Sequence, residues 1–85
     1  MSRTKNNERP IPSGKAIRKA LIDIDQSPVD LARAMGVSPY YIREIYAERR
    51  KATGMRRRIA EYLAVELKRR GYYLPMWARD KETAA

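Results

Sequence analysis

The side chains in this 85-residue chain that could do chemistry are mainly its arginines and lysines, because it contains neither histidine nor cysteine. The commonest general base and metal ligand is therefore missing, and no thiolate site or disulfide can form. The ten acidic residues are scattered, and most stand at helix starts or beside basic residues, where capping and surface pairing explain them. We therefore expect no enzyme activity, no metal or other cofactor and no small-molecule substrate.

The positive charge is concentrated in one short segment. Nineteen Lys and Arg against ten Asp and Glu give a formal net charge of +9. Residues 48–58 carry six basic side chains and one acidic side chain, a net +5, whereas residues 26–47 are net neutral. Such a patch suits nucleic acid, an anionic membrane surface or an acidic protein, and charge alone does not choose among them.

The placement of these basic residues favours phosphate binding. Arg56 and Arg57 are predicted in the first turns of a helix that Thr53 caps, where the helix macrodipole disfavours cations by about 0.3–1 kcal/mol each. Helix N–H groups and guanidinium groups together bind phosphate well. About four to six phosphate contacts per subunit would make log K fall with log salt concentration with a slope of roughly −4 to −5. The side chains expected to clamp a phosphate backbone are Arg49, Arg50, Lys51, Arg56 and Arg57.

Four helices are predicted to position these side chains. Ser27–Pro28 and Ser38–Pro39 each place a serine cap before a proline at the first helical position, which predicts two short helices in succession. Longer helices with one apolar stripe each are predicted before and after this pair, and Gly71 is a stop signal for the last one. The predicted helices span about residues 13–25, 28–35, 39–49 and 53–71.

Residues 28–47 have the residue types that two tightly crossing helices require. Ala32 is small where the helices cross, Gly36 tolerates positive φ at the turn, and Ile42 and Ile45 pin the second helix to the core. With the basic segment that follows, this pattern resembles the helix-turn-helix of the Cro and cI-type phage repressors, the XRE family, over about residues 13–70. The resemblance implies an all-α, compact four- to five-helix bundle of the lambda-repressor-like fold. A four-helix bundle without a DNA-binding role can imitate the pattern by chance.

In this motif the N-terminal part of the second helix enters the major groove. At about 100° per residue, Tyr40 and Ala47 point away from the core, with Arg43 and Glu44 on the shoulders of that face. Arg43 suits guanine O6 and N7, Glu44 suits cytosine N4, and Ala47 suits a thymine methyl group. Plain solvent exposure is the alternative for Tyr40 and Glu44, and partial packing is the alternative to phosphate contact for Tyr41. The predicted DNA-facing residues of this helix are Ser38, Tyr40, Tyr41, Arg43, Glu44 and Ala47.

Two segments lie outside the predicted DNA-binding domain of residues 13–71. Residues 1–12 are interpreted as a flexible basic arm, and residues 72–85 as an aromatic segment followed by an unstructured end from Ala78. The stretch from Tyr72 to Trp77 has too much apolar surface to leave in water, so it either folds back over the bundle or meets a second subunit. The resemblance favours a homodimer through this segment, reading half-sites about 34 Å apart.

The predicted function is therefore sequence-specific binding of double-stranded DNA by a transcriptional regulator. The expected protein is a cytoplasmic, nucleoid-associated repressor that occupies a pseudo-palindromic operator. The second class is a protein-interaction module of antitoxin or scaffold type, which would bind an acidic partner and show no preference among DNA sequences. No membrane partner is expected, because each apolar stripe has a core to fill. RNA binding through the same patch stays an alternative, although no RNA-binding signature is present.

Overall fold

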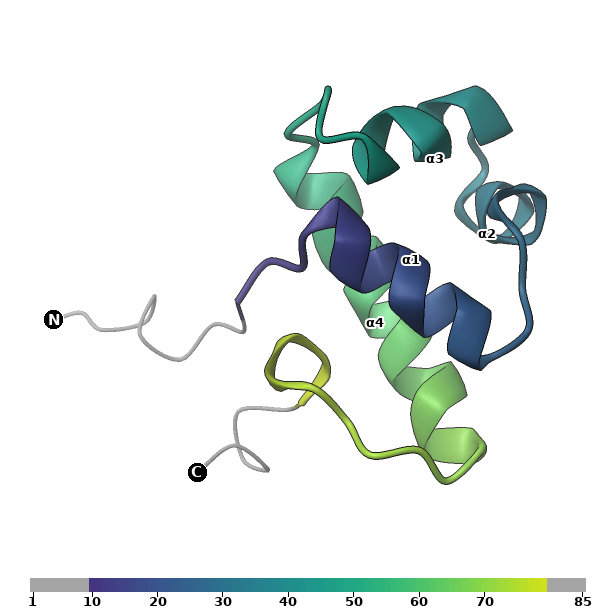
Figure 1. Cartoon of the computed structure of the whole chain (residues 1–85), viewed down its shortest axis with the longest axis vertical. Coiled ribbons are helices and arrows are strands. Elements are labelled where there is room, and N and C mark those ends of the chain that lie inside the picture. Colours follow the sequence, from purple (N-terminus) through teal and green to yellow (C-terminus); the bar gives the residue numbers. More distant parts are fainter. Residues whose placement is uncertain (1–9, 80–85) are drawn as a thin grey trace, which may run out of the picture.

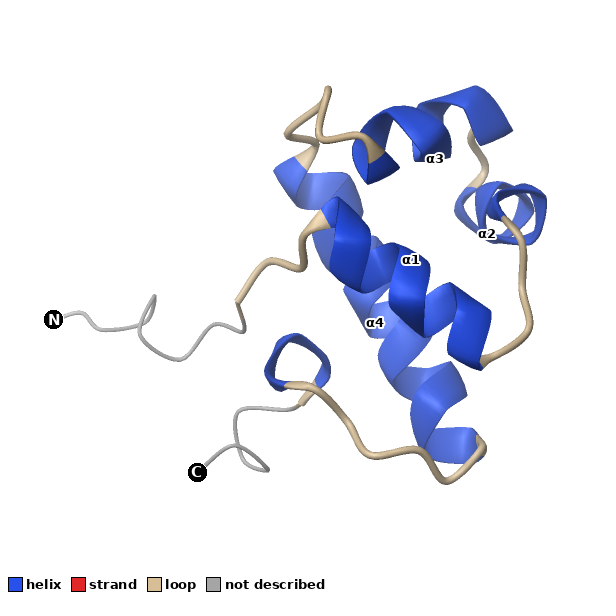
Figure 2. Cartoon of the chain, viewed as in Figure 1, coloured by secondary structure: helices blue, strands red, loops and turns tan. Residues whose placement is uncertain are grey.

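The structure is a computed structural model that describes residues 10–79 of the chain. In this range it contains α-helices, one turn of 3-10 helix and no strand (Figures 1 and 2), which confirms the all-helical prediction for this part of the chain. Each of these helices is too short or too polar to cross a lipid bilayer. Residues 1–9 and 80–85, which include most of the predicted arm and chain end, lie outside the described range. The elements are α1 (Gly14–Asp23), α2 (Pro28–Met35), α3 (Pro39–Tyr46), α4 (Thr53–Arg69) and the 3-10 helix η2 (Met76–Ala78).

Serine hydroxyls begin the first three helices, and the sequence predicted this for the second and the third. Each hydroxyl accepts a hydrogen bond from a backbone N–H in the first turn, a group that has no partner within its own helix. At α2 the Asp30 carboxylate also accepts from the Ser27 N–H at 2.9 Å, which completes a capping box. The hydroxyl to N–H pairs are Ser13 with Ala16 at 3.0 Å, Ser27 with Asp30 at 3.2 Å, and Ser38 with Tyr41 at 3.2 Å.

A short turn joins α2 to α3. Gly36 ends α2 in the left-handed conformation, with φ 75° and ψ 31°, which a residue with a Cβ adopts only with strain. The Val37 N–H then donates to the Ala32 carbonyl at 3.0 Å, which closes the end of α2. This reversal lets α3 start at Pro39 and pack directly against α2.

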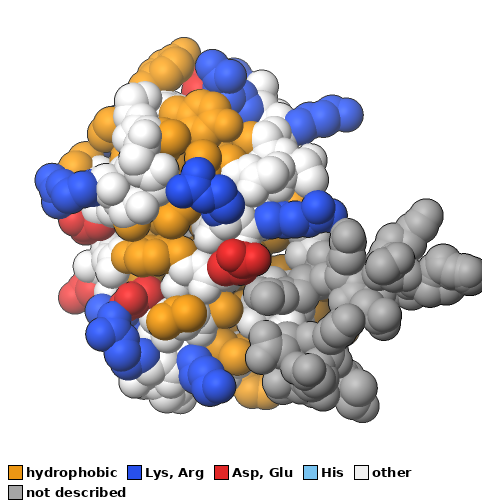
Figure 3. Space-filling view, turned by 180° about the vertical axis from the view of Figure 1, so that it is seen from behind, with side chains coloured by type: hydrophobic (Ala, Val, Ile, Leu, Met, Phe, Trp, Pro, Cys, Tyr) orange, Lys and Arg blue, Asp and Glu red, His pale blue; other side chains and the backbone are white. Residues whose placement is uncertain are grey.

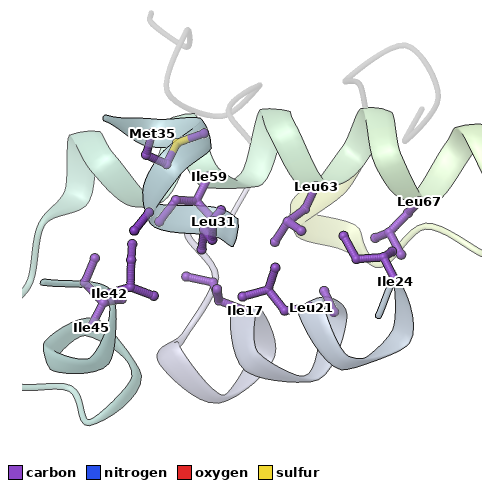
Figure 4. Close-up of a cluster of buried hydrophobic side chains, with 12 residues drawn as sticks. Ile17, Leu21, Ile24, Leu31, Met35, Ile42, Ile45, Ile59, Leu63 and Leu67 are labelled. Atoms are coloured by element: carbon purple, nitrogen blue, oxygen red, sulfur yellow. The ribbon is translucent and has the colours of Figure 1, made fainter. Parts of the chain in front are cut away.

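The predicted apolar stripes meet in one core (Figure 4). α1 packs against α3 and α4, and α2 also packs against α3 and α4 (Figure 1). The α2–α3 pair therefore packs against the α1–α4 pair. Burying each large aliphatic side chain contributes about 1.5–3 kcal/mol. The large core side chains are Ile17, Leu21, Ile24, Leu31, Met35, Ile42, Ile45, Ile59, Leu63 and Leu67.

Two predictions about the connection between α3 and α4 are wrong. α3 ends at Tyr46, about three residues earlier than predicted, because Glu48 adopts the left-handed conformation with φ 61°. Thr53 does not cap α4 but is its first helical residue, because Ala52 is also left-handed, with φ 44°, and occupies the cap position without a side-chain bond. Residues 47–52 therefore form a connection that we call the α3–α4 loop.

The segment after α4 folds back over the bundle, which is one of the two placements expected from its apolar character. In Figure 1 this yellow-green segment turns back at the end of α4, and η2 packs against α4. The Tyr72 hydroxyl donates to the Asp23 carbonyl at 2.8 Å, which ties the segment to the end of α1. Leu74 and Trp77 pack against the core. Ala78 was predicted in the unstructured end, and this is wrong, because the turn of η2 buries it.

Candidate nucleic-acid interface

The outer face of α3 carries the exposed side chains that helical periodicity predicts. Ile42 and Ile45 are fully buried, whereas Tyr40 is 65% exposed on the opposite side. Arg43 and Ala47 are exposed as well. A guanidinium and a phenol therefore project from the outer face of α3, and the methyl group of Ala47 is exposed directly after the helix. These groups suit hydrogen bonding and apolar contact with base edges.

Glu44 is placed differently from its neighbours. Its side chain is only 13% exposed, and its Oε2 accepts a hydrogen bond from Arg49 Nε at 3.0 Å. That bond is the main reason why the pKa of Glu44 lies below its ordinary value, and the same pair raises the pKa of Arg49. Glu44 was expected to accept from cytosine or to lie in solvent. The structure instead commits the carboxylate to an arginine of the α3–α4 loop.

Ser38 and Tyr41 lie at the start of α3. Ser38 is exposed, and its hydroxyl accepts the Tyr41 N–H as the helix cap. Tyr41 is partly buried against the core, and the Arg50 guanidinium carbon lies 5.1 Å from the centre of its ring. This cation–π contact places a second loop arginine over α3.

Basic side chains are exposed next to this helix. Arg49 pairs with Glu44 yet has a 67% exposed side chain, and Arg50 and Lys51 are exposed in the same loop. Arg57 is exposed in the first turns of α4. Arginine binds phosphate through a planar set of donors, and lysine binds it as a point charge. These four side chains are exposed, as phosphate binding requires.

Arg56 was also expected to bind phosphate, but its side chain is buried in the structure. The residue is only 6% exposed, and its guanidinium donates three hydrogen bonds to protein oxygens. Nη1 donates to the Pro12 carbonyl at 3.1 Å, and Nη2 donates to the Arg50 carbonyl at 2.7 Å and to Glu48 Oε1 at 2.9 Å. A buried charge requires such partners. The sequence contained a signal for this, because Arg56 lies three residues before Ile59 on the apolar stripe of α4.

Glu48 and Gly14 complete this arrangement, and neither was identified as a site residue from the sequence. Glu48 Oε2 accepts the Gly14 N–H at 2.5 Å while Oε1 binds Arg56, so one carboxylate joins the start of α1 to α4. The bond from Arg56, followed by the bond from Gly14, lowers the pKa of Glu48. A Cβ at Gly14 would lie 2.7 Å from the Tyr46 carbonyl oxygen, so only glycine allows α1 to approach α3 this closely.

Arg18 extends the positive charge from α3 onto α1. Burial raises the pKa of the Tyr46 hydroxyl, and the positive charges of Arg18 and then Arg43 oppose that shift. Both arginines are exposed, Arg18 on α1 and Arg43 on α3. The sequence assigned Arg18 only to the outer side of the first helix. Arg18 lies one helical turn after Gly14, and only the tertiary structure brings Gly14 against the backbone of Tyr46.

Three other basic side chains, outside α3 and the α3–α4 loop, pair with acidic side chains. Glu66 accepts from Arg69 at 2.6 Å and from Arg70 at 2.7 Å near the end of α4, and Lys19 lies 3.6 Å from Asp23 on α1. Figure 3 shows the side of the molecule opposite to Figure 1, where basic side chains are interspersed with acidic and apolar ones. The candidate interface is therefore best confined to α3, the α3–α4 loop, Arg57 and the adjoining Arg18.

The described part of the chain contains no cluster of three or more acidic side chains that could hold a metal ion. Comparison of this chain with protein-family models, with curated proteins and with solved structures gives no match.

Proposed function

We propose that this chain is a sequence-specific, double-stranded-DNA-binding transcriptional regulator of the helix-turn-helix type, with α3 in the major groove. The observation that carries this proposal is that α3 has one buried side and one exposed side. Ile42 and Ile45 are buried on one side, Tyr40 and Arg43 project from the other, and Ala47 is exposed directly after the helix. A basic loop follows directly, so base-reading groups and phosphate-binding groups adjoin each other, as DNA recognition requires.

The connection between α2 and α3 supports the same proposal. Three residues separate the two helices, Gly36 makes the left-handed turn, and Ala32 is almost completely buried. Short helices that pack directly across such a turn are typical of the helix-turn-helix. This is the feature on which the resemblance to the Cro and cI-type repressors rests.

The proposed contacts fall into two groups. Arg43 binds guanine through O6 and N7, Ala47 contacts a thymine methyl group, and Tyr40 adds a polar or apolar contact nearby. Ser38 lies nearest the flanking phosphates, and Glu44 supports Arg49 rather than reading a base. The side chains proposed to bind the phosphate backbone are Arg49, Arg50, Lys51 and Arg57.

Selection of bound sequences from a random double-stranded DNA pool at physiological salt tests the proposal. We expect the wild type to enrich a pseudo-palindrome, and Arg43→Ala to lose discrimination at one position in each half-site, by about 1–3 kcal/mol. Arg69→Ala is the matched control, because this arginine is exposed at the far end of α4 and pairs with Glu66. It should enrich the same sequence as the wild type. Binding without any enriched sequence would instead favour the interaction module with an acidic partner.

A homodimer belongs to the same proposal, because two copies can place two α3 helices in half-sites about 34 Å apart. Tyr73 is 83% exposed, and Met76, three residues further along the chain, is exposed as well, although Leu74 and Trp77 of the same segment pack on the core. A second copy is the proposed partner of these two side chains. Tyr73→Lys should sediment as a monomer, and Val29→Lys, which changes an exposed side chain of α2, should remain a dimer. A monomeric wild type would contradict this part of the proposal.

A further inference from the structure

We propose that Arg56 and Glu48 are positioning residues that hold the α3–α4 loop in the conformation in which its basic side chains reach phosphate. This inference rests on the proposed DNA binding and assigns to Arg56 an internal role in place of a phosphate contact.

The α3–α4 loop has a backbone shape that its own sequence does not favour. Glu48 has φ 61° and Ala52 has φ 44°, and neither is glycine. Residues with a Cβ avoid the left-handed region, so two of them in one six-residue connection require tertiary contacts to hold them there. Contacts of this kind should be found on the loop backbone and on Glu48 itself.

The Arg56 guanidinium makes both contacts. Its Nη2 donates to the Arg50 carbonyl at 2.7 Å and to Glu48 Oε1 at 2.9 Å, so one group binds two points of the loop. Its Nη1 donates to the Pro12 carbonyl at 3.1 Å, before α1. The second oxygen of Glu48 accepts the Gly14 N–H, which fixes the loop against the start of α1 as well. Because the guanidinium is buried, these directional bonds leave the loop few alternative positions.

The side chains of the loop project from this fixed backbone. Arg56 holds the backbone carbonyl of Arg50, and the guanidinium of Arg50 stacks over the Tyr41 ring. Arg49 Nε is held by Glu44, and 67% of the Arg49 side chain remains exposed to a phosphate. A ligand that meets side chains already in place loses less affinity to ordering them. Loosening the loop should therefore weaken DNA binding although no phosphate-binding side chain is removed.

Glu48→Gln provides the decisive test, because charge and positioning predict opposite results. Removing a negative charge beside a phosphate-binding loop should by itself tighten DNA binding. If Glu48 positions the loop, the dissociation constant for the selected DNA should instead rise about tenfold. The slope of log K against log salt should also become shallower by about one to two per subunit, because fewer loop cations engage phosphate. Binding that is unchanged or tighter in Glu48→Gln would overturn the proposal.

Two controls separate positioning from charge and from stability. Glu61→Gln removes the same charge from an exposed site on α4 and should not weaken binding. Leu67→Ala destabilises the core at the other end of α4, and below its unfolding transition it should bind DNA with the wild-type salt slope. If Leu67→Ala reproduced the loss seen in Glu48→Gln, general destabilisation would explain that loss and the proposal would be overturned.

Arg56→Lys tests the other half of the pair. A lysine keeps the positive charge but not the planar set of donors. If Arg56 contacted phosphate directly, lysine would retain most of the affinity and the salt slope. The positioning role predicts the same tenfold weakening and shallower slope as in Glu48→Gln. If the wild type bound no DNA, the proposed function itself would be refuted. If the wild type and both variants bound DNA equally well, only the positioning role would be refuted.

Discussion

Replacing Gly14 by alanine tests whether α1 and α3 approach each other as closely as the structure shows. A Cβ at this position would lie 2.7 Å from the carbonyl oxygen and 2.8 Å from the Cα of Tyr46. Both are backbone atoms, so no side-chain rotation relieves the clash, and the start of α1 must move away from α3. The same movement would stretch the bond between the Gly14 N–H and Glu48.

The expected size of this effect follows from packing. Overpacking in a well-packed interior typically costs about 1–3 kcal/mol, and a clash with rigid backbone belongs near the upper end. The better helix propensity of alanine offsets up to about 1 kcal/mol of this cost. A net loss of about 2 kcal/mol in a domain of this size lowers the melting temperature by roughly 8–16 °C.

Gly54→Ala is the matched control for this experiment. Gly54 lies in the first turn of α4, does not require positive φ, and has nothing within 4 Å of the added Cβ. The same chemical change should therefore stabilise the protein by about 0.4–1 kcal/mol through the entropy of the unfolded chain. Thermal unfolding followed by circular dichroism measures both variants. If Gly14→Ala raised the melting temperature as Gly54→Ala does, the close approach of α1 to α3 would be refuted.

Three further predictions concern stability. Ile42→Ala should lower the free energy of unfolding by about 2–5 kcal/mol, because Ile42 is fully buried. Arg43→Ala should change the free energy of unfolding by less than about 0.5 kcal/mol, because Arg43 is exposed. Equal losses of the two variants in urea unfolding would refute the assignment of the two faces of α3. Gly36→Ala should cost about 1–2 kcal/mol through its φ of 75° although space is open around it, and an unchanged urea midpoint would show that the turn relaxes freely. The folded-state pKa of Glu48 is lowered, so the contribution of its carboxylate is present above the ordinary value of 4.5 and is lost as the pH falls through the folded value. The urea midpoint of Glu48→Gln should therefore fall less between pH 7 and about pH 3 than that of the wild type, and parallel losses in the two proteins would contradict this.

The helices could be predicted from the sequence because their signals are local. A serine cap, a proline at the first helical position and an apolar side chain every three or four residues act within one or two turns. The structure accordingly has α2 at the predicted residues and the predicted stripes in the core. The outer side of α3 was predictable in the same way, because the positions of Ile42 and Ile45 determine which residues turn away from the core.

The α3–α4 loop could not be predicted in the same way. Its two left-handed residues are not glycines, so no local signal marks the early end of α3 or the cap of α4. For the aromatic segment after α4, the sequence allowed packing either on the bundle or on a second subunit. The apolar character of a side chain predicts that it will be buried but not which surface buries it.

What the sequence by itself determined is the set of helices, the composition of their core and a net charge of +5 in residues 48–58. Only the tertiary structure decided which of those charges are available to a ligand. The Arg56 partner Pro12 is 44 positions away in the chain, and the Glu48 partner Gly14 is 34 positions away. Because an arginine on an apolar stripe can be either a surface cation or a buried anchor, the oxygens brought to it by folding decide the outcome.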